Sequence, residues 1–433
     1  MDDTYLIEIR LAMTRWRIKE SNSAIGLRYD IGDLIERHPH VTLFGPLAVN
    51  PGITEEQLLA EIGRVASGYD PVPFMIGPWE KREGMHGSVI AFSVRPSDEL
   101  KLLTRAIAEA IAPLVRSLNV WDAEPEWKWF HVTVANKLER RRADTIFSRI
   151  TSEKPIRDGY VRYLRGLARK IRGWFLTGRD PVICPVLIDD AGLRVTIMRG
   201  EEILAEYDLP GRRWVTGPEI HDKSSWQKTL AEFRKRAGFE LTGSAPSGSG
   251  GTFFIADLHL GHANIIRYCS RPFLYPDSGE MDRVIIGNWN RTITPDDRVY
   301  FAGDLRYGSD AAPAGEYARQ LAGSTTFIRG NHDTDLPGSV DSAIIEDGDL
   351  RFFIVHDPAD APPDFSGWII HGHHHNNNLG EYPFINFEHR RVNVSAEVVG
   401  YVPVSLREIA ERIHEGVLNG VTAPVLLRYP YVR

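Results

Sequence analysis

The sequence predicts a two-domain α/β (α+β) protein, and three observations support this. The chain has 433 residues, which is more than one hydrophobic core usually serves. Apolar residues recur at strand spacing in some segments and at helix spacing in others. The stretch TGSAPSGSGG at 242–251 has no apolar anchor and is typical of a flexible linker. We therefore expect domains at 1–241 and 252–433.

The first domain is expected to alternate strands and helices. The predicted strands are Tyr5–Leu11, Val41–Phe44, Pro73–Ile76, Ser88–Val94 and Phe130–Val134, and the predicted helices are Thr54–Ala66, Asp98–Leu118 and Tyr160–Trp174. A meander of Val182–Ile188, Leu193–Met198 and Ile203–Leu209 should follow, with turns at 189–192 and 200–201, and then a helix at Ser225–Ala237. The second domain should begin with a short apolar strand, Thr252–Ala256, that leads directly into polar residues.

Composition favours a soluble protein of a reducing compartment. Hydrophobic residues make up 42% and charged residues 25% of the chain, as in ordinary globular proteins. The two cysteines, Cys184 and Cys269, lie far apart and do not suggest a disulfide framework. The N-terminus lacks a signal-peptide pattern, and no apolar run approaches the ~18 residues of a membrane span. We expect a cytoplasmic protein with no membrane association and no obligate protein partner.

Charge is distributed unevenly along the chain. The net charge of -7 argues against nonspecific coating of nucleic acid. Residues 137–172, however, contain twelve Lys or Arg and four Asp or Glu. Within them Arg162, Arg165 and Arg169 recur at helical spacing beside an apolar stripe. This helix is either a track for the phosphate backbone, with nearby aromatic residues to stack a base, or an ordinary solvated face.

Five short polar blocks follow one another in the second half of the chain. They supply carboxylate, imidazole and amide groups, which are metal ligands, from the ends of successive predicted strands. The blocks are Asp257-Leu-His259, Gly303-Asp304, Gly330-Asn331-His332-Asp333, His356 and Gly372-His373-His374-His375.

This order resembles the calcineurin-like metallophosphoesterase family, whose pattern is DxH, GD, GNH with an acidic residue, a lone His and GHxH. The resemblance covers nearly everything after Gly251 and implies a four-layer α/β/β/α sandwich. It also implies two divalent cations, Mn²⁺ first and Fe, Zn or Ni as alternatives, that stabilise an in-line displacement at phosphorus. By this resemblance the first cation is held by Asp257, His259, Asp304 and His375, and the second by Asp304, Asn331, His356 and His373.

The resemblance also assigns roles around the cations. His332 would lie over the phosphoryl oxygens, to stabilise developing charge or to protonate the leaving oxygen, and Asp257 could orient it. Asp333 would orient residues of the site. His262, His371 and His374 receive no role.

Two copies of one tetrapeptide pattern occur in the first domain, His40-Val-Thr42-Leu and His131-Val-Thr133-Val. In a strand, residues two apart project on the same face, so each copy presents an imidazole beside a hydroxyl. Two imidazoles can share the work of a base and an acid, and the hydroxyls can hold nonbridging phosphate oxygens.

The two patterns, together with YLIEIRL and HPHVTLFGP, resemble the 2H phosphoesterase superfamily, which includes 2',5' RNA ligase-like proteins and cyclic phosphodiesterases. The resemblance implies a bilobal fold and a site that needs no metal. It makes His131 the general base and His40 the general acid, although the order could be reversed. The segment from about residue 183 to 241 exceeds a minimal member of this superfamily and is treated as an extension.

Together the two halves predict a bifunctional enzyme of RNA or nucleotide ends. The first domain would open a 2',3'-cyclic phosphate, and the second would remove the resulting phosphomonoester. One alternative is a small-nucleotide substrate such as an ADP-ribose cyclic phosphate, and another is a metal-dependent phosphodiesterase or nuclease. A third alternative is an RNA-binding module without turnover.

Overall fold

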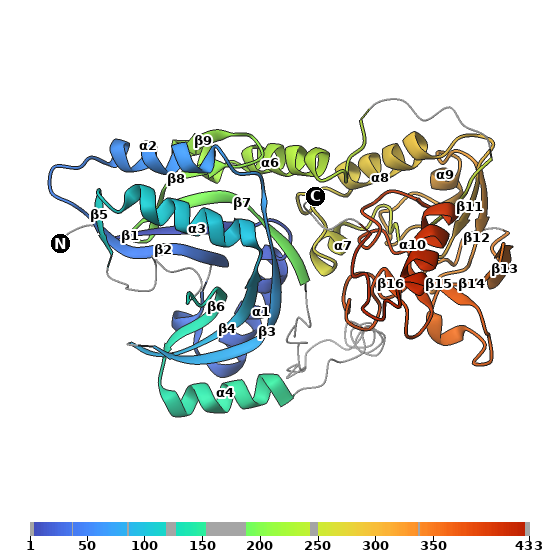
Figure 1. Cartoon of the computed structure of the whole chain (residues 1–433), viewed down its shortest axis with the longest axis horizontal. Helices are drawn as coiled ribbons and strands as arrows, with labels where there is room; N and C mark the ends of the chain where they lie inside the picture. The colour runs from blue at the N-terminus through green and yellow to red at the C-terminus, as the bar shows by residue number, and fades with distance from the viewer. Residues whose placement is uncertain are drawn as a thin grey trace.

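The computed structural model describes residues 4–36, 38–84, 86–117, 127–152, 188–242, 250–336 and 338–428. Two bodies lie side by side, the first built around β1–β9 and the second around β10–β18 (Figure 1). Over these ranges, none of the helices has both the length and the apolar character that crossing a membrane requires.

The strands of the first body form one antiparallel sheet with the order β1-β2-β6-β4-β3-β7-β8-β9, and β5 pairs with β2. Because β7 also pairs with β1, six of the strands close into a ring. The strands are β1 (Thr4–Leu11), β2 (His40–Val49), β3 (Val72–Gly84), β4 (Gly87–Pro96), β5 (Val115–Ser117), β6 (His131–Leu138), β7 (Ile188–Arg199), β8 (Glu202–Asp208) and β9 (Arg213–Thr216). The helices are α1 (Arg15–Tyr29), η1 (Gly32–Leu34), α2 (Glu55–Ala66), α3 (Asp98–Ile111), α4 (Arg140–Ser152), η3 (Gly217–His221) and α6 (Lys223–Arg236).

Local chemistry explains where the helices of this body begin and end. The predicted helix at 54–66 is confirmed as α2, and Thr54 caps it: its side chain accepts from the Gln57 N–H while Gln57 accepts from the Thr54 N–H. The helix predicted at 98–118 is too long. α3 ends at Ile111 because Pro113 cannot donate a backbone hydrogen bond, and the chain then turns into β5.

The turn predicted at 189–192 is wrong, because these residues lie inside β7. Their Asp and Gly composition reflects tertiary contacts instead. The buried Asp190 carboxylate accepts backbone N–H groups of Ala12, Met13 and Thr14 at 3.1, 3.0 and 2.9 Å, and it also contacts the Thr14 hydroxyl. A Cβ at position 192 would lie 2.2 Å from the side chain of Ile9. Asp190 therefore anchors the connection between β1 and α1 to β7.

The extension joins both bodies. Strands β7–β9 continue the sheet, whereas α6 packs with the core of the second body (Figure 1). Arg234 of α6 is buried, with Nη2 2.7 Å from Glu280 Oε1 and Nη1 donating to the Pro272 carbonyl at 3.0 Å. Most of the predicted linker, residues 243–249, lies outside the described residues. On its flanks, Leu241 N donates to Asn288 at 2.8 Å and Gly251 N to Asp297 at 2.6 Å.

The second body contains two sheets that share one core. The four-stranded sheet has the order β12-β11-β10-β18 and the five-stranded sheet β13-β14-β15-β17-β16. The strands are β10 (Thr252–Ile255), β11 (Arg298–Phe301), β12 (Ser324–Phe327), β13 (Ser342–Asp347), β14 (Leu350–Val355), β15 (Trp368–His371), β16 (Ile385–Asn386), β17 (Arg391–Asn393) and β18 (Val404–Ser405). The helices are α7 (Ala263–Tyr268), α8 (Ser278–Thr292), α9 (Ala314–Ala318), η4 (Pro358–Asp360) and α10 (Leu406–Leu418).

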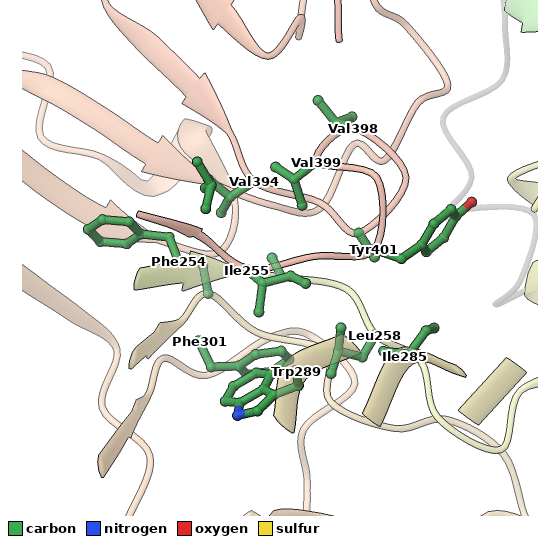
Figure 2. Close-up of a cluster of buried hydrophobic side chains, with 14 of the residues drawn as sticks. Phe254, Ile255, Leu258, Ile285, Trp289, Phe301, Val394, Val398, Val399 and Tyr401 are labelled. Atoms are coloured by element: carbon green, nitrogen blue, oxygen red, sulfur yellow. The ribbon is translucent and has the colours of Figure 1, made fainter. Parts of the chain in front are cut away.

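Apolar side chains from both sheets and from α8 fill this core. Figure 2 shows Phe254 and Ile255 of β10 above Phe301 of β11 and Trp289 of α8, with Val394 on the opposite side. Burial of such large side chains is the main favourable term in folding. The mixed α/β class is as expected, and the assignment of this body to the metallophosphoesterase sandwich stays a prediction.

One predicted helix cannot be compared with the structure. Tyr160–Trp174, with Arg162, Arg165 and Arg169, lies outside the described residues, as does Cys184. Cys269 is a buried free thiol.

We predict that Asp190→Ala lowers the free energy of unfolding by about 3 kcal/mol, because it leaves several buried backbone N–H groups without an acceptor. Asp190→Asn keeps one acceptor oxygen and should lose less. Urea unfolding followed by circular dichroism measures both variants, with the half-buried Asp189→Asn as the control. Equal stability of Asp190→Ala and wild type would contradict the anchoring role.

Candidate functional sites

The two His-x-Thr patterns lie on neighbouring antiparallel strands. β2 pairs with β6 at one position, where Val41 faces Val132. This register sets His40 opposite Thr133 and Thr42 opposite His131, because antiparallel partners run in opposite order. Both valines are fully buried, so the four polar side chains project on the other face of the sheet. The structure thus brings together the two imidazoles and two hydroxyls that the sequence predicts as a site.

Each of the two histidines is oriented by a backbone carbonyl two residues earlier. Nδ1 of His40 lies 2.7 Å from the His38 carbonyl oxygen, and Nδ1 of His131 lies 2.9 Å from that of Trp129. A carbonyl oxygen only accepts, so Nδ1 carries the hydrogen in both rings. In neutral form, each ring therefore has its free lone pair on Nε2.

The surroundings of the two imidazoles differ. The ring of Trp129 stacks on His131 with centroids 3.8 Å apart, and Trp129 Nε1 donates to Glu80 at 2.6 Å. Burial lowers the pKa of His131 from about 6.5 to about 4. His131 is therefore neutral near physiological pH, the state that a general base requires.

His40 faces a carboxylate that sequence reasoning missed. Nδ1 of His40 lies 3.2 Å from Glu8 Oε2, and a carboxylate at this distance stabilises the positive charge of an imidazolium. Burial raises the pKa of Glu8, while His40 and Arg10 oppose that rise. The alternation in YLIEIRL could have indicated Glu8, because it places Glu8 and Arg10 on one face of β1.

The five polar blocks of the second body follow strand ends. Asp257 comes just after β10, Asp304 after β11, Asn331 after β12, His356 after β14 and His373 after β15. β10, β11 and β12 are parallel, as are β14 and β15. Their carboxyl ends therefore meet at common edges, where layered α/β folds build their sites.

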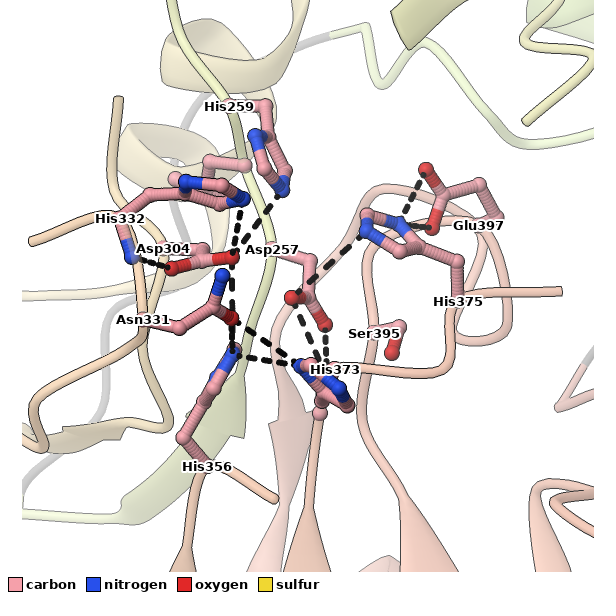
Figure 3. Close-up of polar contacts among 12 residues, drawn as sticks. Asp257, His259, Asp304, Asn331, His332, His356, His373, His375, Ser395 and Glu397 are labelled. Carbon is pink, nitrogen blue, oxygen red and sulfur yellow. Dashed lines mark hydrogen bonds and ion pairs between the residues drawn. The ribbon is translucent and has the colours of Figure 1, made fainter. Parts of the chain in front are cut away.

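Side chains from three of these blocks converge on one oxygen of a fourth, Asp304. Asp304 Oδ2 lies 3.4 Å from His259 Nε2, 3.5 Å from His356 Nε2 and 3.9 Å from His332 Nε2 (Figure 3). Asp304 Oδ1 accepts the His332 backbone N–H at 2.9 Å. Burial opposes ionisation of Asp304, but His259, His356 and His332 outweigh it and hold its pKa well below the usual range.

Two sets of potential ligands flank Asp304. On one side, ligand atoms of Asp257, His259 and His375 lie within 4.8 Å of one another. On the other side, Asn331 Oδ1 lies 2.9 Å from His356 Nε2 and 3.1 Å from His373 Nδ1. The structure thus gathers all seven residues predicted as ligands, although Asp257 also lies within 4.8 Å of Asp304 and His356.

The ligand atoms of this cluster are better arranged to bind a cation than to hydrogen-bond with one another. His259 is buried; its Nδ1 makes no hydrogen bond with a described residue, and its Nε2 faces Asp304 Oδ2 at 3.4 Å. Nδ1 of His356 donates to the Ala302 carbonyl at 2.9 Å. In the neutral ring, the lone pair of Nε2 therefore points at the Asp304 and Asn331 oxygens. Oxygen and imidazole donors that face each other without a hydrogen suit a divalent metal.

Neighbouring residues hold these donors in place. Asp333 accepts the backbone N–H groups of Asp304 at 2.7 Å and Gly330 at 2.9 Å; its orienting role stays a prediction. Glu397, missed from the sequence, accepts from His375 Nδ1 at 3.1 Å and pairs with the buried Arg271 at 2.7 Å. Such contacts fix the ring and leave Nε2 of His375 facing Asp257.

The remaining histidines of the motifs take other positions. The ring of His332 meets Tyr307 edge-on with centroids 4.5 Å apart, and Tyr307 also contacts His262 at 4.5 Å. His374 stacks on Tyr382 with centroids 3.5 Å apart. His371 is buried, with Nδ1 2.9 Å from the Gly372 carbonyl. Of these histidines, His332 also contacts Asp304, through its backbone N–H at 2.9 Å.

Backbone strain concentrates at this cluster. Asp257, His259, Asp304, His373 and His375 have φ values of 57°, 49°, 62°, 71° and 50°. Positive φ is costly for residues with a Cβ and persists where surrounding structure imposes it, often at functional sites. Gly303, with φ 94°, is needed beside them because a Cβ there would lie 2.4 Å from His356 Nδ1.

Comparison with known proteins gives a family for part of the chain. Residues 8–162 match the model of the 2'-5' RNA ligase superfamily. An uncharacterized protein of Methanocaldococcus jannaschii is 45% identical over 166 residues, which are 38% of this chain and 92% of that protein. The chain and this archaeal protein are therefore members of one family.

Two solved structures show weaker likeness. A protein of unknown function from Aquifex aeolicus has a TM-score of 0.30 at 25% identity, covering 38% of this chain and all of that protein. Usb1 of Kluyveromyces marxianus has a TM-score of 0.27 at 13% identity, covering 46% of this chain and 95% of Usb1. The family assignment rests on the sequence match: through residues 8–162, the chain contains a 2H phosphoesterase domain of the 2'-5' RNA ligase superfamily.

Proposed function

We propose that this protein is a bifunctional phosphoesterase of RNA or nucleotide ends. The proposal depends most on the Val41–Val132 register, which sets two His-Thr pairs on one face of a sheet in a domain of the 2'-5' RNA ligase superfamily. The first site opens a 2',3'-cyclic phosphate without a metal. The second site removes the phosphomonoester that results.

His131 and His40 divide the proton transfers at the first site. Nε2 of neutral His131 takes a proton from water as the water oxygen bonds to phosphorus. The bond between phosphorus and one ribose oxygen breaks, and Nε2–H of protonated His40 gives that oxygen its proton. Thr42 and Thr133, each opposite a histidine of the other strand, hold the nonbridging oxygens. The lowered pKa of His131 and the carboxylate beside His40 favour this order over the reverse.

At the second site the residues form two ligand sets that share Asp304. Asp257, His259 and His375 would hold one divalent cation, and Asn331, His356 and His373 the other. When bound, the cations, Mn²⁺ by expectation or else Fe, Zn or Ni, polarise the phosphoryl group and activate water. His332, fixed by Asp304 and Tyr307, faces the leaving oxygen and can protonate it. The imidazole and carboxylate atoms that converge around Asp304 support the presence of a cation.

We predict that the two sites can be separated with a defined cyclic-phosphate RNA. His40→Ala should slow opening by about 100- to 10,000-fold, because it removes the general acid. EDTA or Asp304→Ala should instead stall the reaction at the monophosphate. The products are resolved by chromatography in the presence and absence of Mn²⁺, with the exposed His414→Ala as a control.

Three results would count against this assignment. Opening that depends on Mn²⁺ would reject a metal-free first site. Cleavage of internal phosphodiesters would favour a nuclease, and turnover of ADP-ribose cyclic phosphate alone would favour a small-nucleotide substrate.

The pH dependence of opening follows from His131. Because the pKa of His131 is lowered to about 4, the base stays neutral, and the acid limb of kcat/KM should lie near that value rather than near 6.5. Trp129→Ala removes the stacked ring, exposes His131 and should move this limb upward. Rates measured from about pH 4 to pH 8 test the shift. An acid limb that is the same in both proteins would contradict the role of His131.

Metal binding can be tested without turnover. We predict that the purified protein binds two Mn²⁺ ions and that Asp304→Ala, which removes the shared ligand, loses most of this binding. Metal at 100 times its Kd should stabilise the wild type by about 2.7 kcal/mol for each occupied site. Calorimetric titration and thermal unfolding with and without Mn²⁺ measure both effects. Equal metal binding by wild type and Asp304→Ala would reject the site.

A further inference from the structure

The face that carries the His-x-Thr residues continues across β1, β7 and β8. His40 is the cross-strand partner of Arg10, which is the partner of Arg194, which in turn is the partner of Asp208. A second row runs parallel to it, through Thr42, Glu8, Thr196 and Glu206. Cross-strand partners project on the same face of a sheet. The polar face of the first site therefore extends into β7 and β8, outside residues 8–162.

Direct contacts connect His40 to Glu206 along this face. Glu8 lies 3.2 Å from Nδ1 of His40. Nε of Arg10 lies 3.7 Å from Glu8 Oε1 and 3.2 Å from Glu206 Oε1. The Thr196 hydroxyl donates to Glu206 Oε1 at 3.1 Å. Glu8, Arg10, Thr196 and Glu206 are all buried, so water screens their charges little.

Residues of the extension hold Glu206, the last residue of this series of contacts, in place. Nη1 of Arg194 lies 2.8 Å from Glu206 Oε2. The same guanidinium donates to Ser225 at 3.0 Å and to Thr229 at 2.7 Å, both on α6. Charges therefore alternate from Glu8 through Arg10 and Glu206 to Arg194. In such a buried series, removing one member leaves its neighbours without compensation.

We propose that Glu206, on β8, is a positioning residue for His40: it holds Arg10, and through Arg10 the Glu8 carboxylate, in the place where Glu8 faces Nδ1 of His40. Its use in catalysis rests on the proposed opening of a cyclic phosphate. The extension thereby completes the first site from outside the family segment.

The charge of Glu206 offsets that of Arg10, which gives the effect of its removal a definite sign. Without Glu206, the positive charges of Arg10 and Arg194 lose the carboxylate between them. Both charges then disfavour a proton on His40. Other groups act on this region: Glu36 on Glu8, Arg15 on Arg10 and Glu206, Lys19 on His38, and His131 on His40. All of them are unchanged between wild type and a Glu206 variant, so the comparison isolates Glu206.

NMR titration of the histidine ring protons in the full chain tests the proposal directly. The His40 signal is assigned by its loss in His40→Asn. Glu206→Gln should lower the titration midpoint of His40 by about half a pH unit or more. Glu206→Asp keeps the charge but withdraws it by one methylene and should fall between Glu206→Gln and wild type. Glu202→Gln, an exposed position on the same strand, serves as the matched control and should change nothing.

The alkaline limb of kcat/KM for cyclic-phosphate opening should move in the same direction. If Glu206→Gln does not fold, as judged by circular dichroism, Glu206→Asp decides the test. Folded Glu206 variants with the midpoint of wild type would overturn the proposal. A wild type that opens no cyclic phosphate would reject the proposed function, while the His40 midpoint would still decide whether Glu206 positions His40.

Discussion

The pairing of β2 with β6 is the constraint on which the first site depends. The pairing extends over one residue pair, Val41 and Val132, yet it fixes all four side chains of the two patterns. A slip of either strand by one residue would turn its histidine and threonine to the opposite face of the sheet, because side chains alternate along a strand. The closed ring of strands resists that slip, since β7 pairs with both β1 and β3. The extension thus supports a register between two strands with which it does not itself pair.

A different principle organises the second cluster. There the metal-ligand side chains come from loops after strands, and no ladder of hydrogen bonds sets the distances between them. Asp304 sets these distances instead, because its carboxylate faces His259 and His356 while Asp333 holds its backbone. Burial of this carboxylate is tolerated only with such partners. The positive φ values around it are the local cost of bringing the donors together.

Much of this arrangement could be predicted from the sequence, because period-two and period-3.6 patterns locate strands and helices, and motif order indicates which polar residues gather. The features that the sequence did not predict were missed for physical reasons. Asp189–Gly192 has turn composition, but Asp190 serves backbone groups at least 176 residues away, which no local pattern reveals. Glu8, Glu206 and Glu397 act through other residues rather than within a motif. The single β2–β6 register likewise follows from the closed sheet and not from either strand alone.

Helix α6 ties the two bodies into one mechanical unit. Thr229 holds Arg194, which belongs to the polar face of the first body, and Arg234 pairs with Glu280 of α8 in the second. The two contacts lie five positions apart on one helix, and both are buried. Breaking the first takes an acceptor from the Arg194 guanidinium, and breaking the second takes Arg234 from the buried Glu280 carboxylate. The helix therefore cannot turn to suit one body without disturbing the other. The segment that the sequence presents as an extension of the first domain is, in this structure, the element that contacts both bodies.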